Sequence, residues 1–436
     1  MILLLFLYNL IFTLILGVGI LPFYLYSLKN KRFREGFLER LGFYTPTLRL
    51  DQGSGKRIWV HAASLGEVWV ARAIIEALLT LAPQLDIVLS TITSTGNRAA
   101  KDIFQGKVRV IYFPLDHPLC VRRALHQIQP RAFIGLETEI WPNFITQTRA
   151  KNIPLLLAHG RISARSFRNY YRLKGLFAKL FSSFQIYSMI AEEGAERIQK
   201  LGADPSRIRV AGSAKLDGLF IRLEEEKKKI SGTILLIPKD DLVWAAGSTR
   251  TGEEEIVLSV YQRLRKDFPG LILILAPRHL DRLEKVEELI KKQGLPYQLL
   301  SEIVSGKKER LNQIILVDTM GDLFGLYQWA SVVFCGASLV PKGGQNPLEP
   351  AIWGKPVLYG PHMEDFKEAT ALLQDLQMGF MVHNEMELYT RIKDFLSHPQ
   401  VMRSMEEKGN EMSNFRGAAV AHAQNIYEVL GQKGVL

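Results

Sequence analysis

Three glutamates stand where short apolar runs typical of buried strands come to an end. Glu67 lies just beyond the turn that follows the run Arg57 to His61, at the start of a helical stretch. Glu137 and Glu139 follow another such run. Alternation turns both side chains the same way, so their repulsion raises one pKa unless a cation lies between them. Carboxylates in these places can accept a proton, although Glu67 also suits a helix-start group favoured by the dipole, and Glu139 suits a loop cap.

Two basic side chains follow strand-like runs in the same manner. Lys215 comes after the run Arg207 to Ala211 and is expected to point into a cleft. Arg278 ends the strongly apolar run Leu271 to Ala276. A guanidinium presents a planar fork that matches a phosphate, and an ammonium supplies a compact positive charge. Together they indicate an anionic ligand, although a lone lysine is usually only solvated.

A glycine-rich loop between two further strand-like runs has the features of an anion site. Gly343 and Gly344 let the backbone approach a ligand, and a helix is expected to start soon after them. Asn346 suits the N-cap, Pro347 the first helical position, and Glu349 the place from which a carboxylate reaches back to the capping N–H. The N–H groups and dipole of this helix start favour an anion, but a capping box alone also explains Asn346 and Glu349.

Short apolar runs alternate with helical stretches from residue 57 onward, which is typical of βα units and parallel sheets. The charged stretch 223–232 separates two such series. We therefore predict an α/β chain of two Rossmann-like domains, residues 29–222 and 233–436, facing each other across a cleft lined by strand carboxyl ends. Amphipathic stretches at 385–396 and 418–430 close the chain. The expected strands are 57–61, 87–91, 109–113, 132–136, 154–159, 185–190 and 207–211, then 243–246, 271–276, 297–300, 314–317, 332–336 and 356–359.

Residues 1–28 are almost wholly apolar, with Asn9 as the one strongly polar side chain, and are long enough to cross a bilayer as a helix. A cleaved signal peptide would carry its basic residues on the N-terminal side. Here the flanking basic residues all follow the stretch, so the positive-inside rule places the rest of the chain in the cytoplasm. These residues are Lys29, Lys31, Arg32, Arg34 and Arg40. The sequence therefore predicts an N-terminal membrane anchor.

The 436 residues carry a formal net charge of +11, which calls for a polyanionic partner, either nucleic acid or an anionic membrane and its lipids. Few aromatic residues are interleaved with the basic runs, which disfavours RNA. No strand is followed by Gly-x-Gly-x-x-Gly, which disfavours a nicotinamide dehydrogenase. Cys120 and Cys335 show no metal-ligand spacing and fit a reducing compartment.

Several separated motifs resemble those of the 3-deoxy-D-manno-octulosonic acid (Kdo) transferases, the inner-membrane glycosyltransferases of lipopolysaccharide assembly that use CMP-Kdo. Ser213 and Leu216 depart from the family's pattern, and Gln345 stands where many members carry His. The motifs fall in the family's order over nearly the full length of the chain. They are Ser64-Leu-Gly-Glu67, Glu137-Thr-Glu-Ile-Trp-Pro-Asn143, Gly212-Ser-Ala-Lys-Leu-Asp217, Pro277-Arg278, Asp318-Thr-Met-Gly-Asp322 and Gly343-Gly-Gln-Asn-Pro-Leu-Glu-Pro350.

The resemblance implies a GT-B fold and an inverting enzyme that moves one or more Kdo residues from CMP-Kdo to the lipid A precursor, at the cytoplasmic face of the inner membrane. It assigns Glu67 as proton acceptor, and Glu137 and Lys215 as transition-state stabilisers. No metal or other cofactor is expected, because GT-B enzymes generally place charge on the helix dipole and on basic side chains instead. The implied CMP-binding residues are Pro277, Arg278, Thr319, Met320, Gly321, Asn346, Pro347, Leu348 and Glu349.

Two other functions stay open at this point. One is another GT-B glycosyltransferase with a nucleotide-sugar donor and a lipid acceptor, against which the Ser-Leu-Gly-Glu and Glu-Thr-Glu-Ile-Trp-Pro-Asn motifs argue. The other is a non-catalytic, membrane-anchored binder of anionic lipid. The expected partners are CMP-Kdo, the lipid A precursor and an anionic lipid surface, with no nucleic acid.

Overall fold

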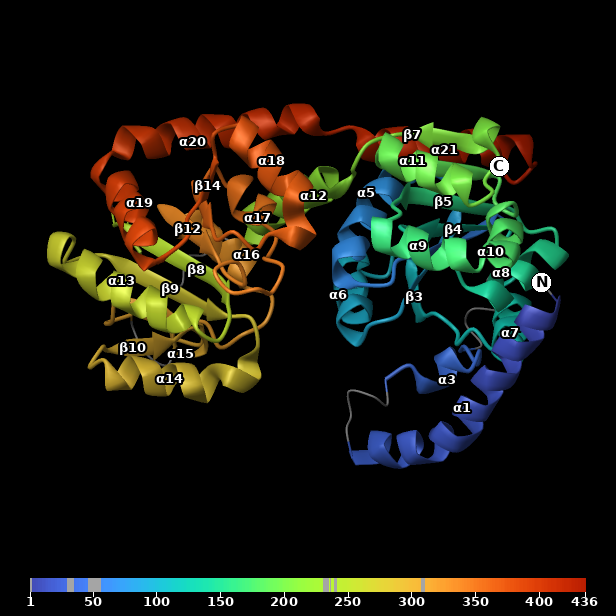
Figure 1. Ribbon diagram of the computed structural model, residues 1–436, viewed down its shortest axis with the longest axis horizontal. Helices are drawn as coiled ribbons and strands as arrows, with labels where there is room; N and C mark the ends of the chain where they lie inside the picture. Colours follow the sequence, from blue (N-terminus) through green and yellow to red (C-terminus); the bar gives the residue numbers. More distant parts are fainter. Residues whose placement is uncertain are drawn as a thin grey trace. The chain divides into compact units, whose positions relative to one another are not determined.

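The computed structural model describes residues 2–29, 35–45, 56–229, 235, 237–238, 241–306 and 310–436. They form two compact units, the first made of Met1–Gly218 with Arg416–Leu436 and the second of Leu219–Phe415. Each unit contains a parallel sheet with helices on both of its faces (Figure 1). The prediction of two parallel-sheet α/β domains is therefore confirmed.

The sheet of the first unit has seven parallel strands in the order β3-β2-β1-β4-β5-β6-β7. Its strands are continuous apolar runs because helices cover both faces. The order reverses between β1 and β4, and at such a point the loops beyond the carboxyl ends diverge and leave room for a ligand. The strands are β1 (Arg57–His61), β2 (Asp86–Thr91), β3 (Arg109–Tyr112), β4 (Ala132–Leu136), β5 (Leu155–Gly160), β6 (Ile186–Met189) and β7 (Ile208–Val210).

Aromatic side chains fill the core between this sheet and the helices beside it. The ring of Trp59 meets that of Phe144 edge-on at 5.0 Å, and Phe133 lies 4.5 Å from Phe144. These rings form an aromatic cluster in the core that joins β1, β4 and α8. The helices of this unit are α1 (Ile2–Lys29), α3 (Phe37–Arg40), α5 (Leu65–Leu81), α6 (Ser94–Phe104), α7 (Pro118–Ile128), α8 (Pro142–Ala150), α9 (Ala164–Arg172), α10 (Lys174–Phe181), α11 (Glu192–Lys200) and α21 (Ala418–Gln432).

The second unit contains another seven-stranded parallel sheet, in the order β10-β11-β9-β8-β12-β13-β14, which reverses between β8 and β12. The short strand β14 was not predicted. The strands are β8 (Val243–Thr249), β9 (Ile272–Pro277), β10 (Tyr297–Leu299), β11 (Ile314–Leu316), β12 (Val332–Cys335), β13 (Val357–Tyr359) and β14 (Gly379–Met381). The helices are α13 (Glu253–Asp267), α14 (Leu283–Lys292), α15 (Leu300–Val304), α16 (Leu323–Leu326), α17 (Leu348–Ala351), α18 (Lys367–Asp375), α19 (Glu385–Ser397) and α20 (Pro399–Glu411).

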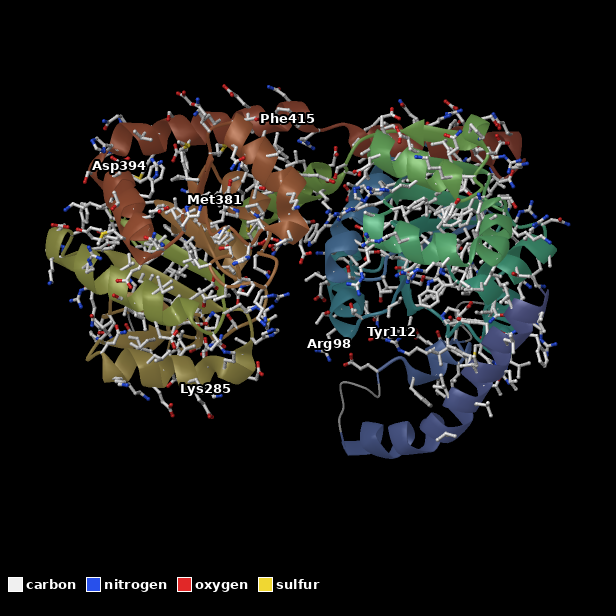
Figure 2. The ribbon with its side chains drawn as sticks, in the orientation of Figure 1. Arg98, Tyr112, Lys285, Met381, Asp394 and Phe415 are labelled. Atoms are coloured by element: carbon white, nitrogen blue, oxygen red, sulfur yellow. The ribbon has the colours of Figure 1, made fainter. Side chains whose placement is uncertain are left out.

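The chain passes between the two units twice. Helix α12 (Lys215–Lys229) leads from the first unit into the second, and the connection after Phe415, labelled in Figure 2, leads back into α21. The second unit therefore ends at Phe415, and the predicted extent of the second domain to residue 436 is wrong. The physical reason is that α21 buries its apolar face against α5, β5 and β6 of the first unit.

Helix α1 contacts the first unit through polar side chains. The hydroxyl of Tyr8 donates to Asp116 Oδ2 at 3.1 Å, and Asn143 Nδ2 donates to Asn9 Oδ1 at 2.7 Å. Its other described side chains include exposed apolar ones such as Phe6 and Val18. Within the described part of the chain, no helix combines the length and the apolar character needed to cross a membrane. The basic residues Lys31, Arg32 and Arg34 lie outside the described residues, and the membrane anchor stays a prediction.

Candidate active site

Glu67 lies in the first turn of α5, shortly after the end of β1. Ser64 occupies the N-cap position, but its hydroxyl donates to Glu67 Oε1 at 2.8 Å and caps no backbone N–H. The backbone N–H of Ala63 donates to Glu67 Oε2, also at 2.8 Å. Both carboxylate oxygens are thus oriented by the turn, in a relative of the capping box that reaches one residue further back.

The environment of Glu67 favours its protonated form. Burial is the main cause, and together with repulsion from Glu137 and Glu139 it raises the pKa of Glu67 from 4.5 to about 7. The hydrogen bonds from Ala63 and Ser64 oppose this rise without cancelling it. A carboxyl group with a pKa near neutrality can both take up and release a proton under ordinary conditions, as a general base requires.

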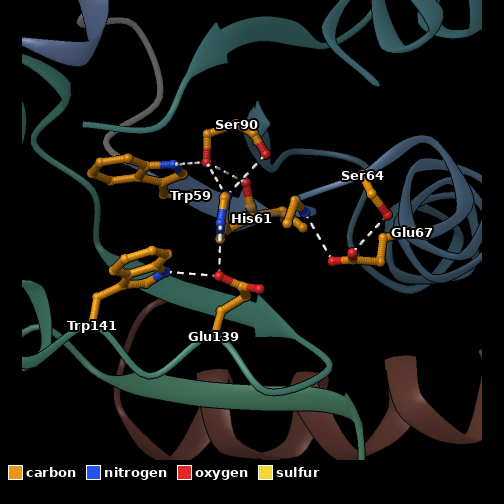
Figure 3. A network of polar contacts seen from close by, with 9 residues as sticks. Trp59, His61, Ser64, Glu67, Ser90, Glu139 and Trp141 are labelled. Carbon is orange, nitrogen blue, oxygen red and sulfur yellow. Dashed lines mark hydrogen bonds and ion pairs between the residues drawn. The ribbon is translucent and has the colours of Figure 1, made fainter. Parts of the chain in front are cut away.

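Trp141 and His61 lie beside Glu139 (Figure 3) and favour its ionised form. Trp141 Nε1 donates to Glu139 Oε2 at 2.8 Å, and His61 Nε2 lies 3.6 Å from the same oxygen. Burial opposes this charge, but His61 and Trp141 outweigh it and hold the pKa of Glu139 below its usual value. His61 in turn contacts Ser90 through Nδ1, at 2.9 Å from the hydroxyl. Glu67 and Glu139 therefore have opposite protonation preferences in one site.

Glu137 occupies a strained backbone position beside a second histidine. Its φ is 55°, in the left-handed region that side chains rarely adopt, and φ of His159 at the end of β5 is 51°. His159 Nδ1 lies 4.0 Å from Glu137 Oε1. Burial is the main cause that lowers the pKa of His159 far below its usual value, and the charges of His422 and Lys215 add to it. Lys215, the first residue of α12, therefore lies close enough to His159 for its charge to act on the imidazole.

The predicted nucleotide residues of the second unit follow β9, β11 and β12. Arg278 directly follows β9, where its backbone N–H donates to Thr249 O at 3.0 Å. Within the described residues, the buried Arg278 Nε and Thr319 Oγ1 have no hydrogen-bond partner. Met320 is exposed, and Gly321 next to it has a φ of 106° that requires glycine. These features leave side-chain and backbone donors at this edge for a ligand.

A buried glutamate at the start of α13 fixes the loop that leads to Gly343. The Oε1 atom of Glu253 accepts from the backbone N–H groups of Ser338 and Leu339, both at 2.9 Å. Its Oε2 atom accepts from those of Ala337 at 2.6 Å and Arg250 at 2.9 Å. Glu253 was not predicted as a functional residue, because its only signal in the sequence is a run of three acidic residues that opens a helix.

The predicted capping box around Asn346 is wrong. The helix α17 begins at Leu348, so that Pro347 is the N-cap residue rather than the first helical one. Asn346 Oδ1 accepts from the N–H of Leu348 at 3.2 Å, but Glu349 does not reach back. Instead, Arg222 of α12 donates to Glu349 Oε1 at 3.3 Å, because a guanidinium outcompetes a neutral N–H as a partner for a carboxylate.

The structure thus assembles the predicted site residues in two groups. Glu67, Glu137 and Lys215 lie in the first unit, at the carboxyl edge of its sheet. The predicted CMP-binding residues lie in the second unit, at the end of β9 and after β9, β11 and β12. Sequence reasoning missed the histidines 61, 159 and 422, since nothing in the motifs distinguishes a buried histidine beside a carboxylate from an ordinary core histidine.

Known proteins are similar to this chain in sequence or in fold. The family described as 3-Deoxy-D-manno-octulosonic-acid transferase (kdotransferase) matches residues 35–218. Over 387 residues the chain is 34% identical to the 3-deoxy-D-manno-octulosonic acid transferase of Haemophilus influenzae, which covers 88% of each chain. The protein of the same description from Aquifex aeolicus is 29% identical over 356 residues, 81% of this chain and 90% of that one. A solved UDP-GlcNAc 2-epimerase from Neisseria meningitidis has a similar fold, with a TM-score of 0.60 over 86% of this chain and 100% of its own, at 13% identity.

Proposed function

The chain belongs to the 3-deoxy-D-manno-octulosonic acid transferase family and is a glycosyltransferase, and from this premise we propose that it moves Kdo from CMP-Kdo to the lipid A precursor with inversion at the anomeric carbon. The observation that carries the proposal is the state of Glu67. Two donors orient this carboxylate, and its pKa is raised to about 7. The substrates are inferred from the family, and the role of a general base is inferred from the geometry of the site.

In the proposed reaction an acceptor hydroxyl attacks the anomeric carbon of Kdo. A carbon–oxygen bond forms as the bond from that carbon to the phosphate oxygen of CMP breaks, and CMP leaves with the electron pair. Glu67 accepts the hydroxyl proton, a role that contributes roughly 10²- to 10⁴-fold to the rate. Lys215 offsets the negative charge of the leaving phosphate or of the Kdo carboxylate, and Glu137 stabilises positive charge that develops on the sugar ring.

The second unit would hold the cytidine nucleotide. Arg278 has the planar donors that suit a phosphate, and its Nε is buried without a partner among the described residues. The N–H groups near Met320 and Gly321 suit the base or phosphate, and Glu349 suits the ribose hydroxyls. Arg222 donates to one carboxylate oxygen of Glu349, and the other oxygen would accept from the ribose hydroxyls. This arrangement needs no metal ion, because basic side chains carry the counter-charge.

We also propose that α1 anchors the enzyme to the cytoplasmic face of the inner membrane, where both the lipid acceptor and an anionic surface are found. The support is the apolar sequence of residues 2–28 and the exposed side chains Leu3, Phe6 and Val18. External protease added to right-side-out spheroplasts should leave the body of the protein intact. Digestion of the whole body from outside would contradict the orientation, and a protein that salt or carbonate extracts fully from the membrane would contradict the anchor.

The function is tested with purified full-length protein, CMP-Kdo and the lipid A precursor. Mass spectrometry should show a lipid product heavier by one or more Kdo residues, and CMP, but not UMP or AMP, should raise the melting temperature. A thermal shift by a uridine nucleotide alone would support a different GT-B glycosyltransferase. CMP binding without any product would support a non-catalytic binder, and either result would overturn the proposal.

A further inference from the structure

A buried histidine of α21 joins this helix to the segment that carries Lys215. This segment, which we call the loop 212–217, comprises the connection after β7 and the first three residues of α12. His422 is fully buried, and its Nε2 lies 3.0 Å from Gly212 O while its Nδ1 lies 2.6 Å from Ser188 Oγ. A carbonyl oxygen can only accept, so Nε2 carries the proton and Nδ1 accepts from the serine hydroxyl. Asn425, one turn further along α21, donates to the same hydroxyl oxygen at 2.8 Å. The neutral imidazole of His422 is thus held in a single tautomer, with the proton on Nε2, between β6 and the loop.

The other end of the same loop is tied to the first turn of α21. Asp217 Oδ1 accepts from the N–H of Gly417 at 2.8 Å, and its Oδ2 from the N–H of Ala419 at 3.4 Å. The carboxylate therefore caps the helix and meets the positive end of its dipole. The loop is held by α21 at residues 212 and 217, and Lys215 lies between these two points.

A second buried histidine links this loop to Glu137. His159 Nε2 lies 3.3 Å from Ser213 Oγ, and its backbone N–H donates to His422 Nδ1 at 3.5 Å. Its Nδ1 is buried, has no hydrogen-bond partner among the described residues and lies 4.0 Å from Glu137 Oε1. A buried polar atom without a partner is costly, and so is a left-handed backbone at both His159 and Glu137. Such costs are retained where the position of a side chain matters for function.

We propose that His422 and His159 are positioning residues for sugar transfer, which hold the Lys215 ammonium and the Glu137 carboxylate in their working places through the loop 212–217. The inference rests on the proposed roles of Lys215 and Glu137. It makes α21 part of the site in the first unit, although no residue of this helix needs to touch a substrate. Misplacing a catalytic group by about 1 Å costs up to roughly 10²-fold in rate, which sets the size of the expected effect.

The test compares His422→Leu, which removes both contacts, with His422→Gln, whose amide N–H can still reach Gly212 O. The matched control is Glu428→Gln, which removes an ion pair between α21 and Arg209 of β7 that does not involve the loop. The rate of single-turnover transfer should fall roughly 10- to 100-fold in His422→Leu, and most of this lost rate should be recovered in His422→Gln. The control should transfer at the wild-type rate, and CMP affinity should stay unchanged in all three.

A double-mutant cycle separates positioning from general loosening of the fold. If His422 acts through Lys215, then His422→Leu should cost little further rate in a Lys215→Ala background. Full additivity of the two effects, or a wild-type rate in a folded His422→Leu enzyme, would overturn the inference. The companion variant His159→Asn keeps a side chain that tolerates the left-handed backbone, and it should lose less activity than His159→Leu. Wild-type rates in Lys215→Ala and Glu67→Gln would instead refute the proposed function itself.

Discussion

Replacing Glu67 by Gln should slow the chemical step strongly and at the same time stabilise the protein at neutral pH. The pKa of Glu67 is raised from 4.5 to about 7, and each pKa unit corresponds to about 1.4 kcal/mol. Ionising Glu67 in the folded protein therefore costs about 3 kcal/mol. A glutamine has nearly the same shape but cannot ionise, so it avoids this cost and also cannot accept a proton.

The sign of the effect on stability follows from proton linkage. Because the folded-state pKa lies above the unfolded one, wild-type stability falls as the pH rises from about 4.5 to about 7. The Glu67→Gln variant lacks this fall. The difference in unfolding free energy between variant and wild type should thus grow in the variant's favour across that window, by up to about 3 kcal/mol. Urea denaturation at a series of pH values measures this difference.

Single-turnover transfer from CMP-Kdo gives the matching kinetic test. Only ionised Glu67 can act as a base, so the wild-type rate should rise with an apparent pKa of about 7 and at pH 5 should be about one hundredth of its plateau. Glu67→Gln should be slower by roughly 10²-fold or more at unchanged CMP affinity. In Glu137→Gln the rise should move to lower pH, because a repelling charge is gone. A folded Glu67→Gln enzyme with near wild-type rate, or a wild-type rate that is flat from pH 5 to 8, would refute the reasoning.

Other parts of the site lead to further predictions. Arg278→Ala should weaken CMP binding in calorimetry by about 1.5–3 kcal/mol, the range for a hydrogen bond to a charged group, and unchanged affinity would contradict its donor-site role. Trp141→Phe removes the N–H that donates to Glu139 but keeps an aromatic ring beside Phe113, so transfer should slow by more than any fall in the melting temperature explains; a normal rate would show that this contact is dispensable. Glu253→Gln leaves buried N–H groups without acceptors and should cost about 3 kcal/mol in urea unfolding, whereas an unchanged midpoint would show that the loop relaxes.

The sheets could be predicted closely because their strands are buried on both faces and read as continuous apolar runs. The strand β14 escaped prediction because Gly379-Phe-Met381 is short, begins with glycine and lies at the edge of its sheet. The helix from residue 418 was predicted, but its packing in the first unit was not. An amphipathic pattern shows which face of a helix is buried without showing which element buries it.

The places of the candidate site residues along the fold could be predicted from the sequence, but their interactions could not. The position of Glu67 after β1 follows from the sequence, but its pKa is raised first by burial and then by the charge of Glu137, which lies seventy residues away in the chain. Glu349 fits a capping box by spacing, yet Arg222 is the partner it finds, from a helix 127 residues earlier. A sequence pattern shows which hydrogen-bond partners a side chain has within its own helical turn. It does not show the partners that the tertiary structure brings from distant segments, which can bind more strongly.

The two-segment construction of the first unit has a consequence for its biosynthesis. The second unit is contiguous, but residues 416–436 follow all of it, so the ribosome completes the second unit before the first can receive α21. At about 5–20 residues per second, the intervening stretch of roughly 200 residues takes about 10–40 s to synthesise. During this time the surface of α5 that α21 later buries is uncovered. We therefore expect a nascent chain of this protein to present an apolar face to chaperones, and slowing translation within residues 219–415 should lengthen its stay with them.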